Sequence, residues 1–347
     1  MEPAVNVVII GASGYTGADA IRLLAEHPFA NIMALTAHQH AGKNLSDIYP
    51  QFSGVSPQIL QTTDEIDWSK VDVAICGLPH GTSQKLIASI PDSVKIIDMS
   101  ADFRLKNTTT YQDWYGLSHD FPDLLSEAVY GLSEHYADAI SSARLVACPG
   151  CYPTAVLTAL LPVIKAGQVI CEDLIIDAKS GVTGAGRSLK ETNLFSEIAE
   201  GLAPYGIAHH RHAPEIEQEL GFAAGLDNVT INFTPHLVPM NRGELVTIYA
   251  KTNGENADEI RSTLDRFYDD KPFVRIVGAD EIPATRHVRG SNYCHVGVYD
   301  DRVPNRVILV ATLDNLVKGS SGQAIQNMNL MCGFEETSGL TQLPLYP

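Results

Sequence analysis

Apolar runs alternate with amphipathic stretches over the first 150 residues of the chain. Continuous apolar runs typical of buried strands occupy residues 4–11, 31–37, 71–79, 94–100 and 144–150. Residues 17–27 and 82–90 instead repeat apolar positions at helical spacing, and Pro28 ends the first of these patterns. Residues 101–144 are polar, with turns expected around Tyr130 and Gly131. The alternation predicts an α/β domain with a parallel sheet covered on both faces, the architecture of nucleotide-binding domains.

Beyond residue 152 the pattern becomes rich in strands. Strands are expected at 173–180, 228–239, 243–252, 273–277, 294–300 and 306–315, and a helix at 256–268. This predicts a second, α+β domain with a mixed, mainly antiparallel sheet and helices on one face. The ending GSSGQAIQNMNLMCGF predicts a helix that packs back on the first domain. We therefore expect one domain from residues 1–151 and 316–347, and another from residues 152–315.

Composition narrows the class of protein. The 347 residues carry a formal charge of -17, which argues against nucleic-acid binding and makes the few basic residues informative for an anionic substrate. No apolar stretch approaches the ~20 residues that cross a bilayer, and no basic region precedes the first apolar run. We expect a cytoplasmic protein that binds no membrane, with six reduced cysteines.

Three glycines follow the first predicted strand and precede the first predicted helix. Gly11, Gly14 and Gly17 form G-x-x-G-x-x-G, a variant of the dinucleotide fingerprint in which glycines allow close approach to a pyrophosphate at a helix N-terminus. Ser13 and Thr16 add hydroxyl donors. The alternative is that the glycines only shape a tight turn.

The end of the second predicted strand indicates which dinucleotide is bound. An NAD site usually has an acidic residue here for the ribose hydroxyls. This chain instead has Thr36, His38, His40 and Lys43 and no acidic residue between them. We therefore expect NADP(H).

The sequence ACPGCYPTAV places Cys151 between a predicted strand and a predicted helix, with Pro153 suited to the first helical position. The helix dipole and amide N–H groups favour a thiolate there, so Cys151 is the candidate nucleophile of a thioester mechanism. Two alternatives remain. Cys148 and Cys151 also fit the C-x-x-C of thiol–disulfide exchange proteins, and an isolated cysteine is often buried and inert.

The segment HHRHAPEI (residues 209–216) supplies candidates for proton transfer. His209, His210 or His212 can exchange a proton near neutral pH, and Glu215 can orient a histidine. The sequence pattern does not choose among the three histidines. Metal binding is less favoured because no second cluster of metal-ligating residues lies nearby, and a solvated polar loop is the other alternative.

Two further segments carry candidate binding residues. Arg104 follows a strand at the carboxyl edge of the predicted sheet, where it can hold a substrate phosphate or form an ion pair. The segment SGVTGAGRSL (180–189) has the glycines of a backbone that passes close to a ligand or of an ordinary flexible loop.

Several motifs in this order resemble the N-acetyl-gamma-glutamyl-phosphate reductase family of arginine biosynthesis, over nearly the whole chain. They are GASGYTG, SADFRL, AVYGL, PGCYPT, DAKSGVTGAGR, HRHAPEI, FTPHLVPMNRG, GSNYC and DNLVKGSSGQAIQNMN. The resemblance implies a Rossmann-like NADPH domain and a catalytic domain with a mixed sheet. It implies a Cys151 thioester made from an acyl phosphate, and its reduction to a semialdehyde.

The resemblance also implies roles for individual residues. Cys151 would be the nucleophile, His210 the acid/base residue and Glu215 its supporting carboxylate. The implied cofactor-binding residues are Gly11, Ser13, Gly14, Tyr15, Thr16, Gly17, Thr36, His38, Gly184, Gly186, Asn315 and Lys318. Arg104, Arg242 and His212 would contact the substrate. Some relatives have asparagine where this chain has Cys148, so the resemblance assigns Cys148 no role.

Two other functions stay open at this point. Aspartate-semialdehyde dehydrogenases share the architecture and chemistry, although HRHAPEI and PGCYPT favour the reductase. A non-catalytic NADPH-binding regulator would keep the glycine loop and have no use for Cys151. The family and the strand-rich second domain predict a homodimer or homotetramer, and neither excludes related amino-acid acyl phosphates as substrates.

Overall fold

The computed structural model describes residues 5–346 of the chain. These residues form two compact units. The first contains the described residues up to Pro149 together with Ser320–Gln342, and the second contains Gly150–Gly319 with the described residues from Leu343 onward. Ala4, which begins the first expected strand, and the expected domain ends at residues 1 and 347 lie outside the described residues.

The first unit is built on a parallel sheet of seven strands in the order β3-β2-β1-β4-β5-β7-β6. The strands are β1 (Val5–Ile10), β2 (Ala30–Thr36), β3 (Leu60–Gln61), β4 (Val73–Cys76), β5 (Lys95–Asp98), β6 (Val129–Tyr130) and β7 (Leu145–Ala147). Consecutive residues are buried in the central strands, as in Val73–Cys76, because helices cover both faces. The expected nucleotide-binding architecture is confirmed.

The helices of this unit follow its strands along the chain. They are α1 (Tyr15–Leu24), α2 (Leu45–Ile48), α3 (Ser83–Ser89), α4 (Thr108–Tyr115), α5 (Pro122–Glu127), α6 (Ser133–Ser142) and α11 (Gly322–Cys332). The C-terminal α11 packs against α1, α6 and β5, as expected from its sequence. Within the polar segment 101–144, turns were expected around Tyr130 and Gly131, but Tyr130 ends the short strand β6, and the segment also contains α4, α5 and α6, which were not predicted.

Local hydrogen bonds explain why α4 forms in a polar sequence. Asn107 caps the helix, its side chain accepting from the backbone N–H groups of Thr109 and Thr110. Gly116 ends the helix in the left-handed region with φ 69°. Between these caps only Tyr111 and Tyr115 are buried, so the apolar repeat that predicts helices from sequence is too short to detect.

The second unit contains a mixed sheet of seven strands in the order β12-β13-β14-β11-β8-β10-β9. Its strands are β8 (Ile175–Gly181), β9 (Ala203–Pro204), β10 (Asn232–Val238), β11 (Glu244–Lys251), β12 (Val274–Ile276), β13 (Cys294–Asp300) and β14 (Arg306–Leu313). The β8–β10 and β12–β13 pairs are parallel and the other pairs antiparallel, so the expected mixed sheet is confirmed.

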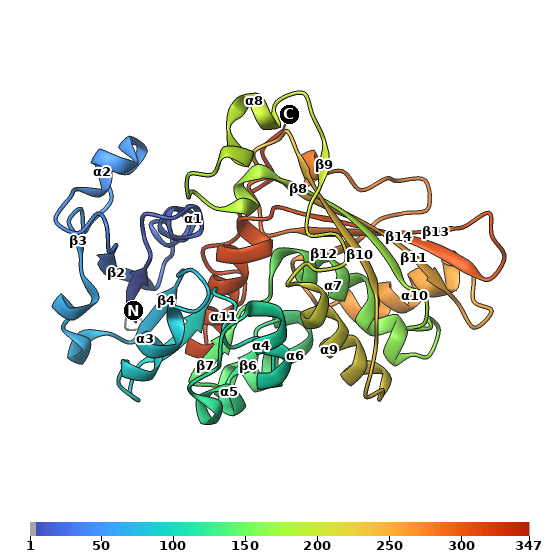
Figure 1. Ribbon diagram of the computed structural model, residues 1–347, viewed down its shortest axis with the longest axis horizontal. Helices are drawn as coiled ribbons and strands as arrows, with labels where there is room; N and C mark the ends of the chain where they lie inside the picture. Colours follow the sequence, from blue (N-terminus) through green and yellow to red (C-terminus); the bar gives the residue numbers. More distant parts are fainter. Residues whose placement is uncertain (1–4, 347) are drawn as a thin grey trace. The chain divides into compact units, whose positions relative to one another are not determined.

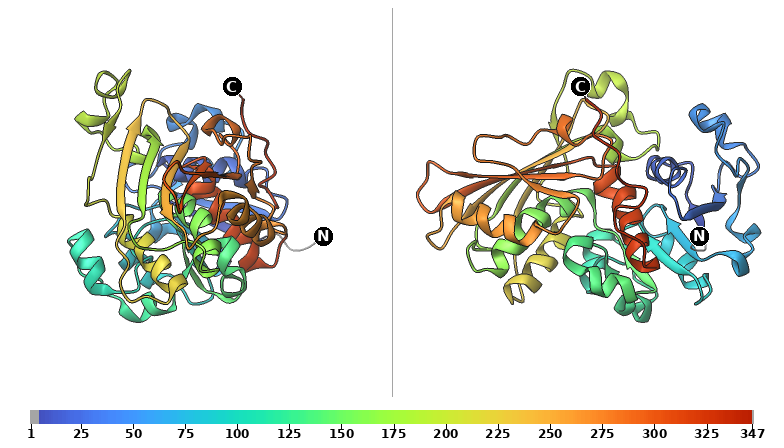
Figure 2. Two further views of the ribbon diagram at one scale, coloured as in Figure 1. Left: turned by 90° about the vertical axis from the view of Figure 1, so that its right-hand side faces the viewer. Right: turned by 180° about the vertical axis from the view of Figure 1, so that it is seen from behind.

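Helices lie along one face of this sheet. They are α7 (Cys151–Lys165), α9 (Ala213–Ala224) and α10 (Ala257–Tyr268); the short α8 (Phe195–Ile198) lies apart from these three, at the top of Figure 1. Figure 1 shows α7, α9 and α10 lying along the strands. The view from behind in Figure 2 shows these helices on the same side of the sheet. Residues Tyr152–Ile164 of α7 are all buried, so this helix forms the centre of the unit's core.

We predict that Gly11→Ala destabilises the first unit more than Gly42→Ala. Both glycines have a left-handed φ, +86° and +82°, so alanine strains both by about 1–2 kcal/mol. At Gly11 the added Cβ would also lie 2.3 Å from the carbonyl oxygen of Gly77, whereas at Gly42 it meets nothing within 4 Å. Urea unfolding of the two variants measures the difference. Equal losses would show that the glycine loop tolerates the clash.

Candidate active site

In the first unit, the glycine loop is held between β1 and β2 by backbone hydrogen bonds. The N–H groups of Gly11 and Ala12 donate to the Thr36 carbonyl at 3.1 and 2.9 Å. Gly14 is the N-cap of α1, and the first turn of that helix contains no acidic residue. The loop therefore ends at an uncompensated helix N-terminus, which favours a bound anion.

The glycines fit a dinucleotide for a steric reason. A Cβ at Gly17 would lie 2.4 Å from the Gly11 carbonyl oxygen, so only glycine allows the helix to start so close to the loop. Ser13, Tyr15 and Thr16 are partly exposed along this turn. These features match the tight-turn and close-packing roles of glycines in dinucleotide-binding loops.

The end of β2 presents basic rather than acidic groups. His38 and Lys43 are exposed, as a site for a ribose phosphate requires. Thr36 differs from expectation: its side chain is buried, and its carbonyl accepts the two loop N–H groups. The backbone carbonyl of Thr36 therefore helps to hold the glycine loop in place.

In the second unit, Cys151 is the first residue of α7 and Gly150 is the N-cap. The helix thus begins two residues earlier than the expected start at Pro153. Pro153 is tolerated there because the N–H groups of the first helical turn have no intrahelical acceptor. The first turn of α7 has no acidic residue, so its dipole favours negative charge on the Cys151 sulfur. Cys151 is partly exposed.

The N-terminus of α9 holds the N-terminus of α7. Glu215, fully buried in the first turn of α9, accepts a hydrogen bond of 2.8 Å from the backbone N–H of Gly150. The N-cap of α9 is His212, and a Cβ at Gly150 would lie 2.4 Å from its Nε2. Glu215 was expected to support a histidine, and the hydrogen bond seen here fixes the backbone next to Cys151.

His210 lies in a box of aromatic rings. The rings of Tyr152, Tyr205, His212 and Phe233 contact it edge-on, with centroids 4.8–5.8 Å away. Its Nδ1 accepts from the His212 backbone N–H at 3.2 Å, so Nε2 carries the proton of the neutral ring. Burial, with a smaller effect of Arg211, lowers the pKa of His210 to about 4. The ring is therefore neutral at physiological pH.

Glu244, which sequence reasoning missed, is the first residue of β11 and fully buried. Burial raises its pKa to about 8; the neighbouring Cys151 thiol acts against this rise, and the charge of Asp314 adds to it. A usable signal was present, since alternation in ELVTIYAK puts Glu244 on the same face as Val246, Ile248 and Ala250. An acidic residue on the apolar face of a strand marks a candidate site.

Four other residues predicted from the sequence lie in the second unit, in the segments that follow β8 and β14. The Asn315 side chain accepts from the Gly243 N–H at 2.8 Å and donates to Thr183. Gly184 lies close to Ser180 and Asn315, and Gly186 has φ +78° in open space. Lys318 is fully buried, with its ammonium 5.8 Å from the Phe273 ring centre.

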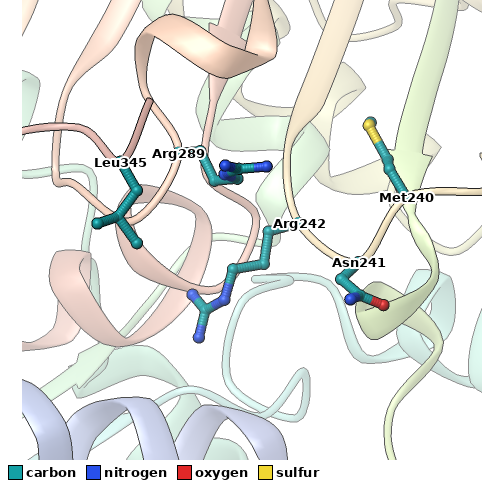
Figure 3. A pocket seen from close by; sticks show the side chains of 5 residues that line it. All are labelled: Met240, Asn241, Arg242, Arg289 and Leu345. Carbon is teal, nitrogen blue, oxygen red and sulfur yellow. The ribbon is translucent and has the colours of Figure 1, made fainter. Parts of the chain in front are cut away.

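Arg242 lines a pocket of about 420 Å³ (Figure 3). The other lining residues are Met240, Asn241, Arg289 and Leu345. Its guanidinium forms an ion pair of 3.4 Å with the buried Asp314, so one edge of the arginine is anchored and the pocket is basic. Such a pocket suits a substrate anion.

Arg104 and Cys148 are buried in the first unit. Arg104 donates to the Met99 carbonyl at 3.0 Å. Burial raises the pKa of the Cys148 thiol to about 12, and none of the six cysteines forms a disulfide. A thiol with this pKa is a poor partner in thiol–disulfide exchange, which weakens the C-x-x-C alternative.

Within residues 5–346, no group of three or more histidine, cysteine or acidic side chains is arranged to hold a metal ion. In the same part of the chain, no helix has both the length and the apolar character needed to span a bilayer.

Two sequence families match the chain. Residues 6–143 match the family described as semialdehyde dehydrogenase, NAD binding domain, and residues 151–315 match semialdehyde dehydrogenase, dimerisation domain. Among solved structures, aspartate semialdehyde dehydrogenase II from Vibrio cholerae has a similar fold (TM-score 0.72, 19% identity, 96% of this chain and 99% of that one). The enzyme from Candida albicans, solved with NADP, is also similar (TM-score 0.68, 15% identity, 95% and 98%). The fold is that of a semialdehyde dehydrogenase.

Closer relatives specify the family. The chain is 51% identical to the N-acetyl-gamma-glutamyl-phosphate reductase of Rhodospirillum rubrum, over the full length of both. It is 48% identical to a protein of Arabidopsis thaliana named probable N-acetyl-gamma-glutamyl-phosphate reductase, chloroplastic, over 100% of this chain and 86% of that protein. The chain belongs to the N-acetyl-gamma-glutamyl-phosphate reductase family.

We predict that His210 makes the second unit less stable in mild acid. Below pH ~6.5 the unfolded chain binds a proton at this histidine, but the folded protein does so only near pH 4, so folding becomes less favourable between these values. Urea unfolding of wild type and His210→Asn at pH 7.5 and pH 5 measures the effect. The stability difference should shift in favour of the variant at pH 5, and a difference independent of pH would refute the assignment.

Proposed function

We propose that this chain reduces N-acetyl-gamma-glutamyl phosphate to N-acetyl-glutamate semialdehyde and phosphate, with NADPH as the reductant, in arginine biosynthesis. The observation that carries the proposal is a cysteine at the N-terminus of a buried helix, with a neutral histidine packed on Tyr152, the residue after it, in a member of this reductase family. The aspartate-semialdehyde dehydrogenases of Vibrio cholerae and Candida albicans share the fold at only 19% and 15% sequence identity, so the fold alone favours neither substrate.

The first chemical step belongs to Cys151. Its thiolate attacks the carbonyl carbon of the acyl phosphate, the C–O bond to phosphate breaks, and a thioester forms on the sulfur. Amide N–H groups of the first turn of α7 stabilise the oxyanion formed during this attack. Glu215 supports this role by fixing Gly150, so that the start of the helix does not shift.

His210 transfers the proton in the second step, the reduction of the thioester. NADPH, when bound, supplies the hydride that reduces the thioester. As the carbonyl oxygen gains negative charge, the Nε2–H of neutral His210 donates to it, and the ring takes the proton back when the aldehyde forms. His212, packed on Gly150, contacts the substrate or positions His210 through its backbone N–H.

The cofactor is assigned to the first unit. Gly11, Gly14 and Gly17 would lie against the pyrophosphate, with Ser13, Tyr15 and Thr16 beside it, and His38 near the ribose phosphate. We keep Gly184, Gly186, Asn315 and Lys318 as proposed contacts toward the nicotinamide end, and Arg104 and Arg242 as proposed contacts for substrate anions. The basic pocket that Arg242 lines supports the last of these.

We also propose that the first unit is the NADP domain and the second is the catalytic domain, which associates into a homodimer or homotetramer. The second unit exposes apolar side chains along one segment, as an interface requires. These are Leu189, Leu194, Phe195, Leu202 and Ile207. A cytoplasmic location fits the reduced cysteines.

The nucleophile is tested by running the reaction backwards. Phosphate-dependent reduction of NADP by N-acetyl-glutamate semialdehyde should fall by several orders of magnitude in Cys151→Ser. It should survive in Cys148→Ser, because that buried thiol is not a nucleophile and a hydroxyl can still accept from Asn327. Equal loss in both variants would restore the exchange alternative, and a wild type that binds NADPH without turnover would indicate a regulator.

Cofactor preference is tested at the end of β2. His38→Asp should lower kcat/KM for NADPH by about 10-fold or more relative to NADH, because a carboxylate there repels the ribose phosphate. His38→Asn removes the imidazole without adding negative charge, so it separates a lost contact from repulsion. An unchanged preference in His38→Asp would place the ribose elsewhere.

A further inference from the structure

Glu244 is an unusual residue for the position it occupies. It begins β11 on the apolar face of the second sheet, where the following inward residues are Val246, Ile248 and Ala250. Its side chain is fully buried, and neither carboxyl oxygen has a hydrogen-bond partner of regular geometry among the described residues. Burying a carboxyl group without partners is costly, so such a group is retained where the chemistry uses it.

Strand register places Glu244 beside the nucleophile. Glu244 is paired with Leu313 of β14 and Ser180 of β8, so the three side chains are on one face of the sheet. A Cβ added to Gly319 would lie 3.1 Å from a methyl carbon of Leu313 and 2.8 Å from the Cβ of Cys151. Leu313 and Cys151 thus meet across Gly319, and α7 packs against β11 and β14 on this face.

Few other ionisable groups act on this carboxyl. Cys151 and Tyr152 approach it from α7, Tyr205 from the segment after β9, and Asp314 from the end of β14. Asp314 is held separately by Arg242 and by the Gly290 N–H. The phenols of Tyr152 and Tyr205 have pKa values raised mainly by burial and stay protonated. Cys151 is therefore the neighbour with which Glu244 can exchange a proton.

We propose that Glu244 is a further catalytic residue, the group that accepts the proton of the Cys151 thiol as the sulfur attacks the acyl phosphate. The inference rests on the proposed role of Cys151 as the nucleophile. The S–H bond breaks and an O–H bond forms on Glu244, so the negative charge of the carboxylate passes to the oxyanion and leaves with the phosphate. When the sulfur later leaves the reduced intermediate, the proton returns to it.

The separate roles of Glu244 and His210 follow from how readily each side chain accepts a proton. His210 is a weak acceptor, because burial lowers its pKa to about 4 and its Nδ1 already accepts from the His212 N–H. Glu244 is a better acceptor, because burial raises its pKa to about 8. His210 is then free to act at the substrate oxygen, while Glu244 acts at the sulfur.

The test is the pH dependence of Cys151 alkylation by iodoacetamide, followed by mass spectrometry of the peptide that contains Cys151. It needs no substrate. In wild type the alkylation rate should rise in two steps, because the coupled pair releases its two protons separately. Glu244→Gln leaves one titrating group and should give a single step. Glu244→Asp keeps a carboxyl and should keep two steps.

A matched control is Glu134→Gln, which removes another buried carboxyl, one that lies in the first unit. It should keep the two steps. Thermal unfolding of each variant checks folding, and the wild-type profile is informative by itself. A single step in wild type, or the same profile in wild type and a folded Glu244→Gln, would overturn the proposal.

Turnover gives an independent readout. In the reverse assay Glu244→Gln should lower kcat by about 100-fold or more, with little change in KM for the semialdehyde, since the group acts on the sulfur and not on binding. If Cys151→Ser retains activity, the proposed function fails at its nucleophile. If Cys151→Ser is inactive and Glu244→Gln is fully active, only the role of Glu244 fails.

Discussion

The hydrogen bond from the Gly150 N–H to Glu215 is the contact on which the site of the second unit depends. It joins the start of α7, which carries Cys151, to the first turn of α9, which follows His210 in the chain. Without a side chain at Gly150, the His212 ring packs directly on the backbone that precedes the nucleophile. The cysteine is therefore positioned by two helix ends that fix each other, and not by a mobile loop. Glu215 is buried, so water does not compete for this bond.

Burial has opposite effects on the two proton carriers near Cys151. It disfavours charge on both groups, which lowers the pKa of the His210 imidazole and raises that of the Glu244 carboxyl. One apolar environment thus produces a neutral donor at the substrate side and a proton acceptor at the sulfur side. Two groups with separated pKa values are the arrangement that acid–base catalysis requires.

Much of the fold could be predicted from sequence because its core elements are strongly periodic. The strand at Cys294–Asp300 and the helix at Ala257–Tyr268 follow directly from alternation and from the three- and four-residue repeat. The four elements within residues 101–144 could not be predicted this way, since caps such as Asn107 and sparse tyrosines define them. The start of α7 was misplaced by two residues because proline is tolerated throughout a first turn, not only at its first position.

The candidate site was predictable to the extent that its residues share a sequence motif. Cys151, the histidines and Glu215 lie in two short motifs. Glu244 lies some 30 residues beyond the second motif and reaches Cys151 only through the pairing of β11 with β8 and β14, which no local pattern specifies. Its one local signal, acidity within an apolar alternation, was available and went unused. The contact of Thr36 with the glycine loop could not be predicted either, because a carbonyl contact is independent of side-chain identity.

The burial of Tyr152–Ile164 in α7 has a consequence for how the protein loses activity when it unfolds. A helix enclosed on every side cannot fray at its first turn without exposing Tyr152 and the apolar residues behind it. Local melting near Cys151 is therefore nearly as costly as disrupting the interior of the second unit. Heat or denaturant should abolish catalysis and tertiary structure of that unit together, so residual turnover serves as a gauge of the fraction still native.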